Sequence, residues 1–193
     1  MKENSVLIAE YDKIEEGNLL AIIDFFQSNY DSLFSSGLTE LAKIEHIYID
    51  YFVSLHDKSR YSKILEVIDK MEQLDVFKLY RKTDTEFDEQ VRFYKYSSLF
   101  SKKRYADSKR GFAELLRDYP ENEDYQDWFS DSKNRIRIKT FALLMYLTGG
   151  FMFIVLILRL YLHLPILVQI SRIAEGLFII SVVLYFTRFI KKH

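Results

Sequence analysis

Histidines and clustered carboxylates are the side chains of this sequence best able to hold a metal ion or move a proton. The four histidines, His46, His56, His163 and His193, lack the close spacing that would set two of them on one helical face beside a carboxylate. The acidic run "ENEDYQD" at 121–127 is typical of a solvated face or a helix start rather than of an acid–base pair. We therefore expect no metal site, no cofactor and no enzymatic activity.

Cysteine and glycine narrow the chemistry further. Cysteine is absent, which excludes disulfides, cysteine nucleophiles and thiolate metal sites. The adjacent glycines Gly149 and Gly150 lie in an apolar run and not in a phosphate-binding loop. The N-terminus carries no basic region followed by an apolar stretch, so we expect no cleaved export signal.

The charge is divided unevenly along the chain of 193 residues. Residues 1–132 carry 18 Lys and Arg against 27 Asp and Glu, a net of −9, whereas residues 133–193 carry 9 against 1, a net of +8. The acidic part would repel nucleic-acid phosphates, so we expect no nucleic-acid partner. The sequence thus predicts an acidic domain, 1–132, joined to a basic and apolar tail, 133–193.

The acidic part shows helical spacing of its apolar residues throughout, with no alternating strand pattern. Apolar residues at this spacing form a stripe along one face of each expected helix, and the stripes end at polar or glycine-containing turns such as "SSG" and "HDKSR". The pattern predicts an all-α domain built from pairs of helices, over residues 5–15, 18–35, 39–56, 61–81, about 93–100 and 105–119.

These pairs repeat along the chain. Leu19, Tyr61 and Tyr105 each open the second helix of a pair, at spacings of 42 and 44 residues. The last pair, "SSLFSKKRYADSKRGFAELLRDYPEN", resembles the tetratricopeptide repeat family, with Ser108 at the small position and Phe112 at the large aromatic one. The likeness covers about 5–130, with a longer period than the family's.

The resemblance implies stacked helix pairs that bind a peptide or helix of another protein. Some tetratricopeptide domains hold a C-terminal carboxylate with basic residues of their first helices, and Arg92 and Lys95 are the candidates for this role. Tyr125 and Trp128 lie on an expected capping helix, 122 to about 132. We expect them to cover the end of the last repeat, with a role in partner binding as the alternative.

The tail predicts two membrane spans joined by a tight turn. The first, about 141–163, would be about 34 Å long at roughly 1.5 Å per residue, enough for a bilayer core of about 30 Å. The second follows Pro165 over about 166–189. Basic residues flank the outer ends of both spans: Lys133, Arg135, Arg137, Lys139, Arg188, Lys191 and Lys192. By the positive-inside tendency, both termini are expected in the cytoplasm.

Four ionisable residues, Arg159, His163, Arg172 and Glu175, interrupt the apolar runs of the tail. Arg159 and His163 lie at the far end of the first span, where a long side chain can reach the headgroups. Arg172 and Glu175 share a helix face, because they are three residues apart. Either they form an ion pair inside the membrane and contact the first span or another subunit, or the second span begins near Ile173 and they lie at the wet interface.

These features together predict an integral membrane adaptor that recruits another protein through its helical domain. The alternative is a pore, transporter or effector subunit formed by the tail hairpin and regulated by the helical domain. In either case the bilayer is a partner, and assembly into a homo-oligomer or a larger membrane complex is compatible with the sequence.

Overall fold

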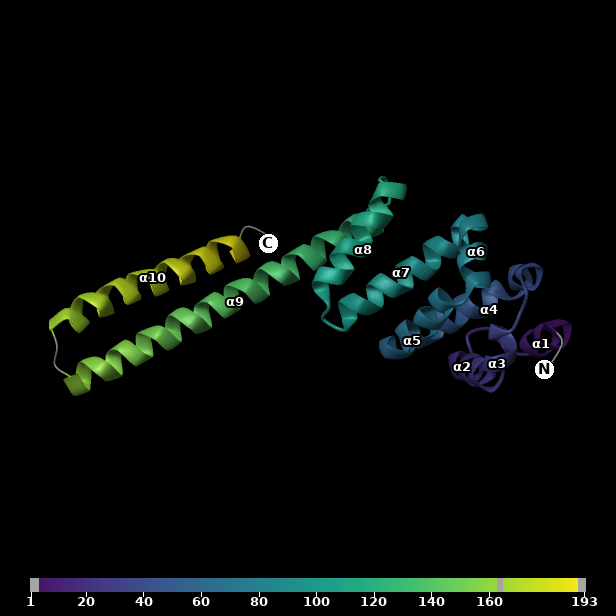
Figure 1. Ribbon diagram of the computed structural model, residues 1–193, viewed down its shortest axis with the longest axis horizontal. Coiled ribbons are helices and arrows are strands. Elements are labelled where there is room, and N and C mark those ends of the chain that lie inside the picture. The colour runs from purple at the N-terminus through teal and green to yellow at the C-terminus, as the bar shows by residue number, and fades with distance from the viewer. Residues whose placement is uncertain (1–3, 163–164, 191–193) are drawn as a thin grey trace. The chain divides into compact units, whose positions relative to one another are not determined.

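The described part of the chain consists of helices and the turns between them. A computed structural model describes residues 4–162 and 165–190, with side chains described in these ranges except at 160, 165–167, 181 and 184–190 (Figure 1). No strand occurs in these ranges, so the all-α prediction is confirmed. The helices are α1 (Asn4–Tyr11), α2 (Leu19–Ser28), α3 (Tyr30–Phe34), α4 (Leu38–Asp57), α5 (Tyr61–Gln73), α6 (Asp75–Thr83), α7 (Thr85–Ser101), α8 (Tyr105–Asp118), α9 (Glu123–Leu162) and α10 (Pro165–Ile190).

The chain divides into two compact units, Met1–Ser132 and Lys133–His193, which we call the helical unit and the tail unit. The boundary lies within α9, whose first residues belong to the helical unit and whose remainder belongs to the tail unit. The sequence places a separate capping helix before the first span, but the structure has one uninterrupted helix there. No glycine or proline lies between Glu123 and Thr148 to end it.

The helical unit has a closely packed aromatic core. Phe26 and Tyr51 stack with ring centroids 3.8 Å apart, and both are almost fully buried. Tyr48 and Phe77 also lie in this core, which joins α1 through α7. Further along, α7 packs against α5 and α8. The helices of this unit therefore bury their apolar faces against one another.

A second cluster closes the helical unit. Trp128 of α9 stacks on Phe112 of α8, with centroids 5.7 Å apart and planes 11° apart. Tyr125 is 7 % exposed and belongs to the same cluster. The first turns of α9 thus cover the end of the last helix pair.

The turns before α5 and α8 have the same backbone geometry. Ser59 (φ 55°) and Lys103 (φ 63°) are left-handed. In each turn the next amide reaches back five residues, from Arg60 to Leu55 and from Arg104 to Leu99, at 2.8 and 2.9 Å. This is the Schellman arrangement, which pairs the last carbonyls of α4 and α7.

The left-handed position recurs before α2 as well. Gly17, with φ of 81°, stands two residues before Leu19, as Ser59 stands before Tyr61 and Lys103 before Tyr105. Leu19, Tyr61 and Tyr105 are the first residues of α2, α5 and α8. A residue with positive φ thus precedes α2, α5 and α8 at the same distance, although only the turns before α5 and α8 share the hydrogen bond that reaches back five residues.

Two expected helices are divided in the structure. The stripe over 18–35 breaks at Asn29 into α2 and α3, and the stripe over 61–81 breaks at Leu74 into α5 and α6. Leu74 takes an extended conformation, with φ of −93° and ψ of 123°. An apolar residue in a regular stripe gives no local signal of such a break.

Within the tail unit, α10 folds back along α9 (Figure 1). A methyl group added to Gly149 would lie 3.6 Å from the Phe178 ring, so the two helices touch there. Val155 of α9 is buried, as are Ser171 and Ala174 of α10. Among the described side chains of the tail unit, the buried ones include small Ser171 and Ala174, while large apolar ones such as Leu147 and Phe153 are exposed.

Candidate binding surfaces

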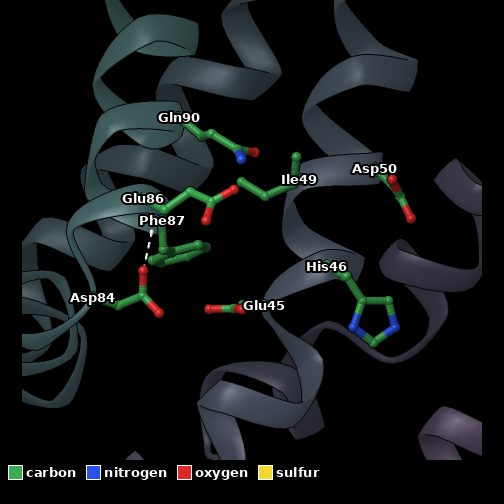
Figure 2. A pocket seen from close by; sticks show the side chains of 8 residues that line it. All are labelled: Glu45, His46, Ile49, Asp50, Asp84, Glu86, Phe87 and Gln90. Atoms are coloured by element: carbon green, nitrogen blue, oxygen red, sulfur yellow. Dashed lines mark hydrogen bonds between the residues drawn. The ribbon is translucent and has the colours of Figure 1, made fainter.

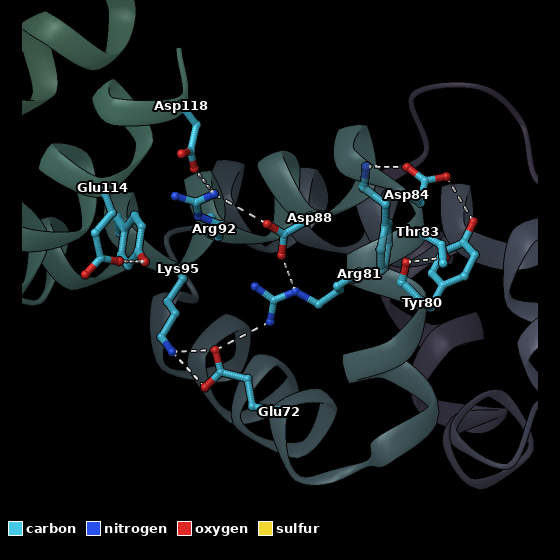
Figure 3. A network of polar contacts seen from close by, with 12 residues as sticks. Glu72, Tyr80, Arg81, Thr83, Asp84, Asp88, Arg92, Lys95, Glu114 and Asp118 are labelled. Atoms are coloured by element: carbon cyan, nitrogen blue, oxygen red, sulfur yellow. Dashed lines mark hydrogen bonds and ion pairs between the residues drawn. The ribbon is translucent and has the colours of Figure 1, made fainter. Parts of the chain in front are cut away.

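The two residues predicted to hold a partner's carboxylate both have carboxylate partners within the chain. Arg92 lies 2.7 Å from Asp118 and 3.5 Å from Asp88. Lys95 lies 2.6 Å from Glu72. Figure 3 shows both in one network across α5, α7 and α8. A peptide carboxylate binding at this surface would therefore compete with carboxylates already in place.

The network extends through a second arginine. Arg81 of α6 lies 2.6 Å from Asp88 and 3.5 Å from Glu72, and its side chain is 16 % exposed. Arginine's planar fork suits such a bridge, because one guanidinium can donate to two carboxylates. The chain of ion pairs holds α6 against α5 and α7, so its first role is to stabilise the packing of these helices.

An open cavity of about 260 Å³ lies between α4 and the start of α7 (Figure 2). Its lining is acidic, with Glu45, Asp50, Asp84 and Glu86 beside the apolar side chain of Phe87. Most of these carboxylates have partners inside the protein. Asp84 accepts from the backbone N–H of Phe87 at 2.9 Å and so caps α7.

Tyrosines donate hydrogen bonds to three of the cavity carboxylates, Glu45, Asp50 and Asp84. Tyr80 donates to Glu45 and, at 3.2 Å, to Asp84. Tyr11 donates to Asp50 at 2.5 Å. The same kind of pair recurs between other helices, from Tyr125 to Glu89 at 2.5 Å and from Tyr96 to Glu114 at 2.9 Å.

These pairs hold the tyrosines in their protonated, donating form. Burial, the hydrogen bond to Glu114 and that carboxylate's charge raise the pKa of Tyr96 to about 12. The same causes, in the same order, raise the pKa of Tyr11, Tyr80 and Tyr125 above the ordinary tyrosine value. Part of the acid excess of the helical unit is thus used to join helices through phenol hydroxyls.

The histidines do not form a site where the structure describes them. His46 is exposed and packs edge-on against Tyr11, and His56 packs against Tyr61 and Tyr94. Burial lowers the pKa of His56. Among the described residues, no group of three histidines and carboxylates is arranged to hold a metal ion. His163 and His193 lie outside the described residues.

The basic residues before the first apolar run lie on the surface of α9. Lys133, Arg135, Arg137 and Lys139 are all exposed. The side chain of Arg188, and all of Lys191 and Lys192, lie outside the described residues. Of the two basic flanks of the predicted hairpin, the structure therefore describes the side chains of the one before the first span.

Arg172 and Glu175 are exposed residues of α10, one turn apart. Glu175 accepts a hydrogen bond from the buried Ser171 hydroxyl at 3.1 Å. Within the described part of the chain Arg172 forms no ion pair with it. Ser171 was not predicted; its signal is the i, i+4 spacing of a hydroxyl and a carboxylate on one helix.

Comparison with protein-family models, with curated proteins and with solved structures finds no match to this chain.

Proposed function

We propose that the protein is a membrane-anchored interaction protein, with the tail unit in the bilayer and the helical unit as its partner-binding part. The observation that carries the proposal is the apolar half of α9. In the described residues this is the one helix long and apolar enough to cross a membrane, and 6 % of its most apolar stretch is buried.

The large side chains of this stretch face outward. Leu147 is 63 % exposed, Phe153 is 65 % and Ile154 is 57 %. Burial of apolar surface is favourable by about 25 cal/mol per Å². A water-soluble protein would cover this surface with other elements, whereas a bilayer covers it with lipid.

The second span, 166–189, corresponds to α10, Pro165–Ile190. Many of its side chains lie outside the described residues, so it enters as part of the proposal. The hairpin is supported by the return of α10 along α9 and by the length of both helices, since a span needs about 20 residues.

The orientation rests on basic residues. Lys133, Arg135, Arg137 and Lys139 are exposed just before the apolar run, and positive charge is retained on the cytoplasmic side. These residues support an orientation with both termini in the cytoplasm, in which Arg188, Lys191 and Lys192 follow the second span on the same side.

The interaction role rests on the helical unit. Its paired helices with a repeated turn are tetratricopeptide-like in pattern, and such stacks present extended surfaces to peptides or helices. The work of an adaptor is to raise the local concentration of its partner at the membrane. Arg92 and Lys95 stay the candidates for a carboxylate-bearing partner, which must displace Asp118 and Glu72.

The experiment compares the full chain with residues 133–193 alone. Both are purified from native membranes in mild detergent, and the proteins that accompany each are identified. We expect one protein to accompany the full chain in fixed proportion and to be absent with the tail. Recovery of the full chain alone would overturn the adaptor role.

The charged positions Arg172 and Glu175 favour one competing function, in which the hairpin itself forms a pore or a transporter subunit. Charged residues inside spans often line a conduction path. Leakage of an entrapped dye from vesicles that contain residues 133–193 alone would support this function, and tight vesicles would exclude it.

A further inference from the structure

The contact between α9 and α10 sets the depth of the charged pair. Gly149 touches Phe178 and lies in the middle of the uncharged run of α9, which extends from Thr140 to Leu158. In an antiparallel hairpin, each step back along α10 corresponds to one step forward along α9. Glu175 is thus level with Met152 and Arg172 with Val155.

Both charges therefore lie within the hydrocarbon of a spanning hairpin. At about 1.5 Å per residue, Glu175 lies about 4.5 Å and Arg172 about 9 Å from the level of Gly149. Half of a bilayer core is about 15 Å thick. An arginine can extend its side chain toward the headgroups, but a glutamate is too short to do so.

The fold leaves these groups without an adequate partner. The Ser171 hydroxyl satisfies one acceptor position of the Glu175 carboxylate, which has about four. Among the described side chains of α10, Ser171 and Ala174 are buried and Phe178 lies against Gly149 of α9, while Arg172 and Glu175 are exposed. A charge in hydrocarbon is costly, so a second protein surface must meet them.

We propose that α10 pairs with α10 of a second copy of this chain through two reciprocal contacts between Arg172 and Glu175. The proposal rests on the membrane anchoring proposed above. Two copies with the same topology lie parallel, related by a two-fold axis along the membrane normal. Each arginine then faces the other copy's glutamate, about 4.5 Å along the axis and within its reach.

Charge complementarity selects a second copy over another protein. The exposed face carries one positive and one negative group at helical spacing, so it is complementary to itself. A two-fold pair satisfies all four charges without a further partner. Ile179, seven residues after Arg172 and 60 % exposed, lies on the same face and should meet its symmetry mate.

The test uses the full chain in native membranes. Because the sequence contains no cysteine, Ile179→Cys and Leu177→Cys each introduce a single thiol. Both positions are exposed. Because they are two positions apart on the helix, their side chains point in directions about 200° apart. Under mild oxidation we expect a disulfide-linked dimer from Ile179→Cys and at least tenfold less from Leu177→Cys.

Charge variants in the Ile179→Cys background test the ion pairs. Arg172→Glu should reduce the dimer at least tenfold, and the exchange Arg172→Glu with Glu175→Arg should restore it. Equal cross-linking at the two cysteine positions, or an exchange that does not restore the dimer, would overturn the proposal. So would a stable larger complex with a different protein and no Ile179→Cys dimer.

Extraction of the same membranes with alkaline carbonate separates the two proposals. A chain released by carbonate contradicts the membrane anchor itself. A chain retained in the membrane without a dimer contradicts the pairing of α10 and leaves the anchor standing.

Discussion

The helical unit and the tail unit bury opposite kinds of side chain. In the helical unit the largest aromatic residues are inside, with Phe26, Tyr48 and Phe112 fully buried. In the tail unit the buried side chains Ser171, Ala174 and Val155 are small or medium-sized, while Phe153 and Leu147 are more than half exposed. Water favours the first arrangement, because burial removes large apolar side chains from water. Lipid favours the second, because lipid tails are themselves apolar and no hydrophobic effect drives such side chains inward. The pattern of side-chain burial therefore differs between the two units of one chain.

The largest expected difference between the two units appears when one aromatic ring is removed from each. Phe26→Ala should lower the free energy of unfolding of the helical unit by about 3–5 kcal/mol, because it leaves a cavity beside Tyr51. Phe153→Ala, at an exposed position of the tail, should leave it unchanged. Urea titration of the full chain in mild detergent, followed by circular dichroism, measures both. Equal losses would mean that the two units share one core.

A smaller contrast concerns glycines. A methyl group on Gly111 would come within 2.1 Å of the Tyr96 ring, whereas one on Gly150 meets nothing within 4 Å. Gly111→Ala should therefore destabilise the helical unit by about 1–3 kcal/mol, and Gly150→Ala should have no effect on it. Melting temperatures of the two variants in detergent give the comparison. A neutral Gly111→Ala would show that α7 and α8 separate easily.

The smallest effect tests the left-handed turn before α5. Ser59 is left-handed, a conformation that costs a non-glycine residue about 1–2 kcal/mol. Ser59→Gly should therefore stabilise the helical unit by up to about 1 kcal/mol. Lys58→Gly, at φ of −85°, should destabilise it instead. The same sign at both positions, measured by urea titration, would contradict the turn geometry.

Features of the fold could be predicted from the sequence where residues close together in the sequence mark them. The starts of α2, α5 and α8 were predictable because Leu19, Tyr61 and Tyr105 follow polar turns and open apolar stripes. The break at Leu74 was not, since no glycine or proline marks it. Local patterns therefore located the helices and missed some of their ends.

The candidate surfaces were less predictable, because their contacts are distant in sequence. The resemblance indicates Arg92 and Lys95 as candidates, but their partners Asp118 and Glu72 lie 26 and 23 residues away in the sequence. The bond from Tyr11 to Asp50 joins residues 39 positions apart. Only the folded packing of the helices brings such groups together, and one sequence gives no sign of the pairing.

The stacking of Trp128 on Phe112 has a spectroscopic consequence. Trp128 is the single tryptophan of the chain, and it lies four residues before the boundary between the two units. Its emission therefore reports the docking of the first turns of α9 on α8, separately from the helix content of the whole chain. A partner or a lipid that loosens this end of the helical unit would change the fluorescence without any label being added.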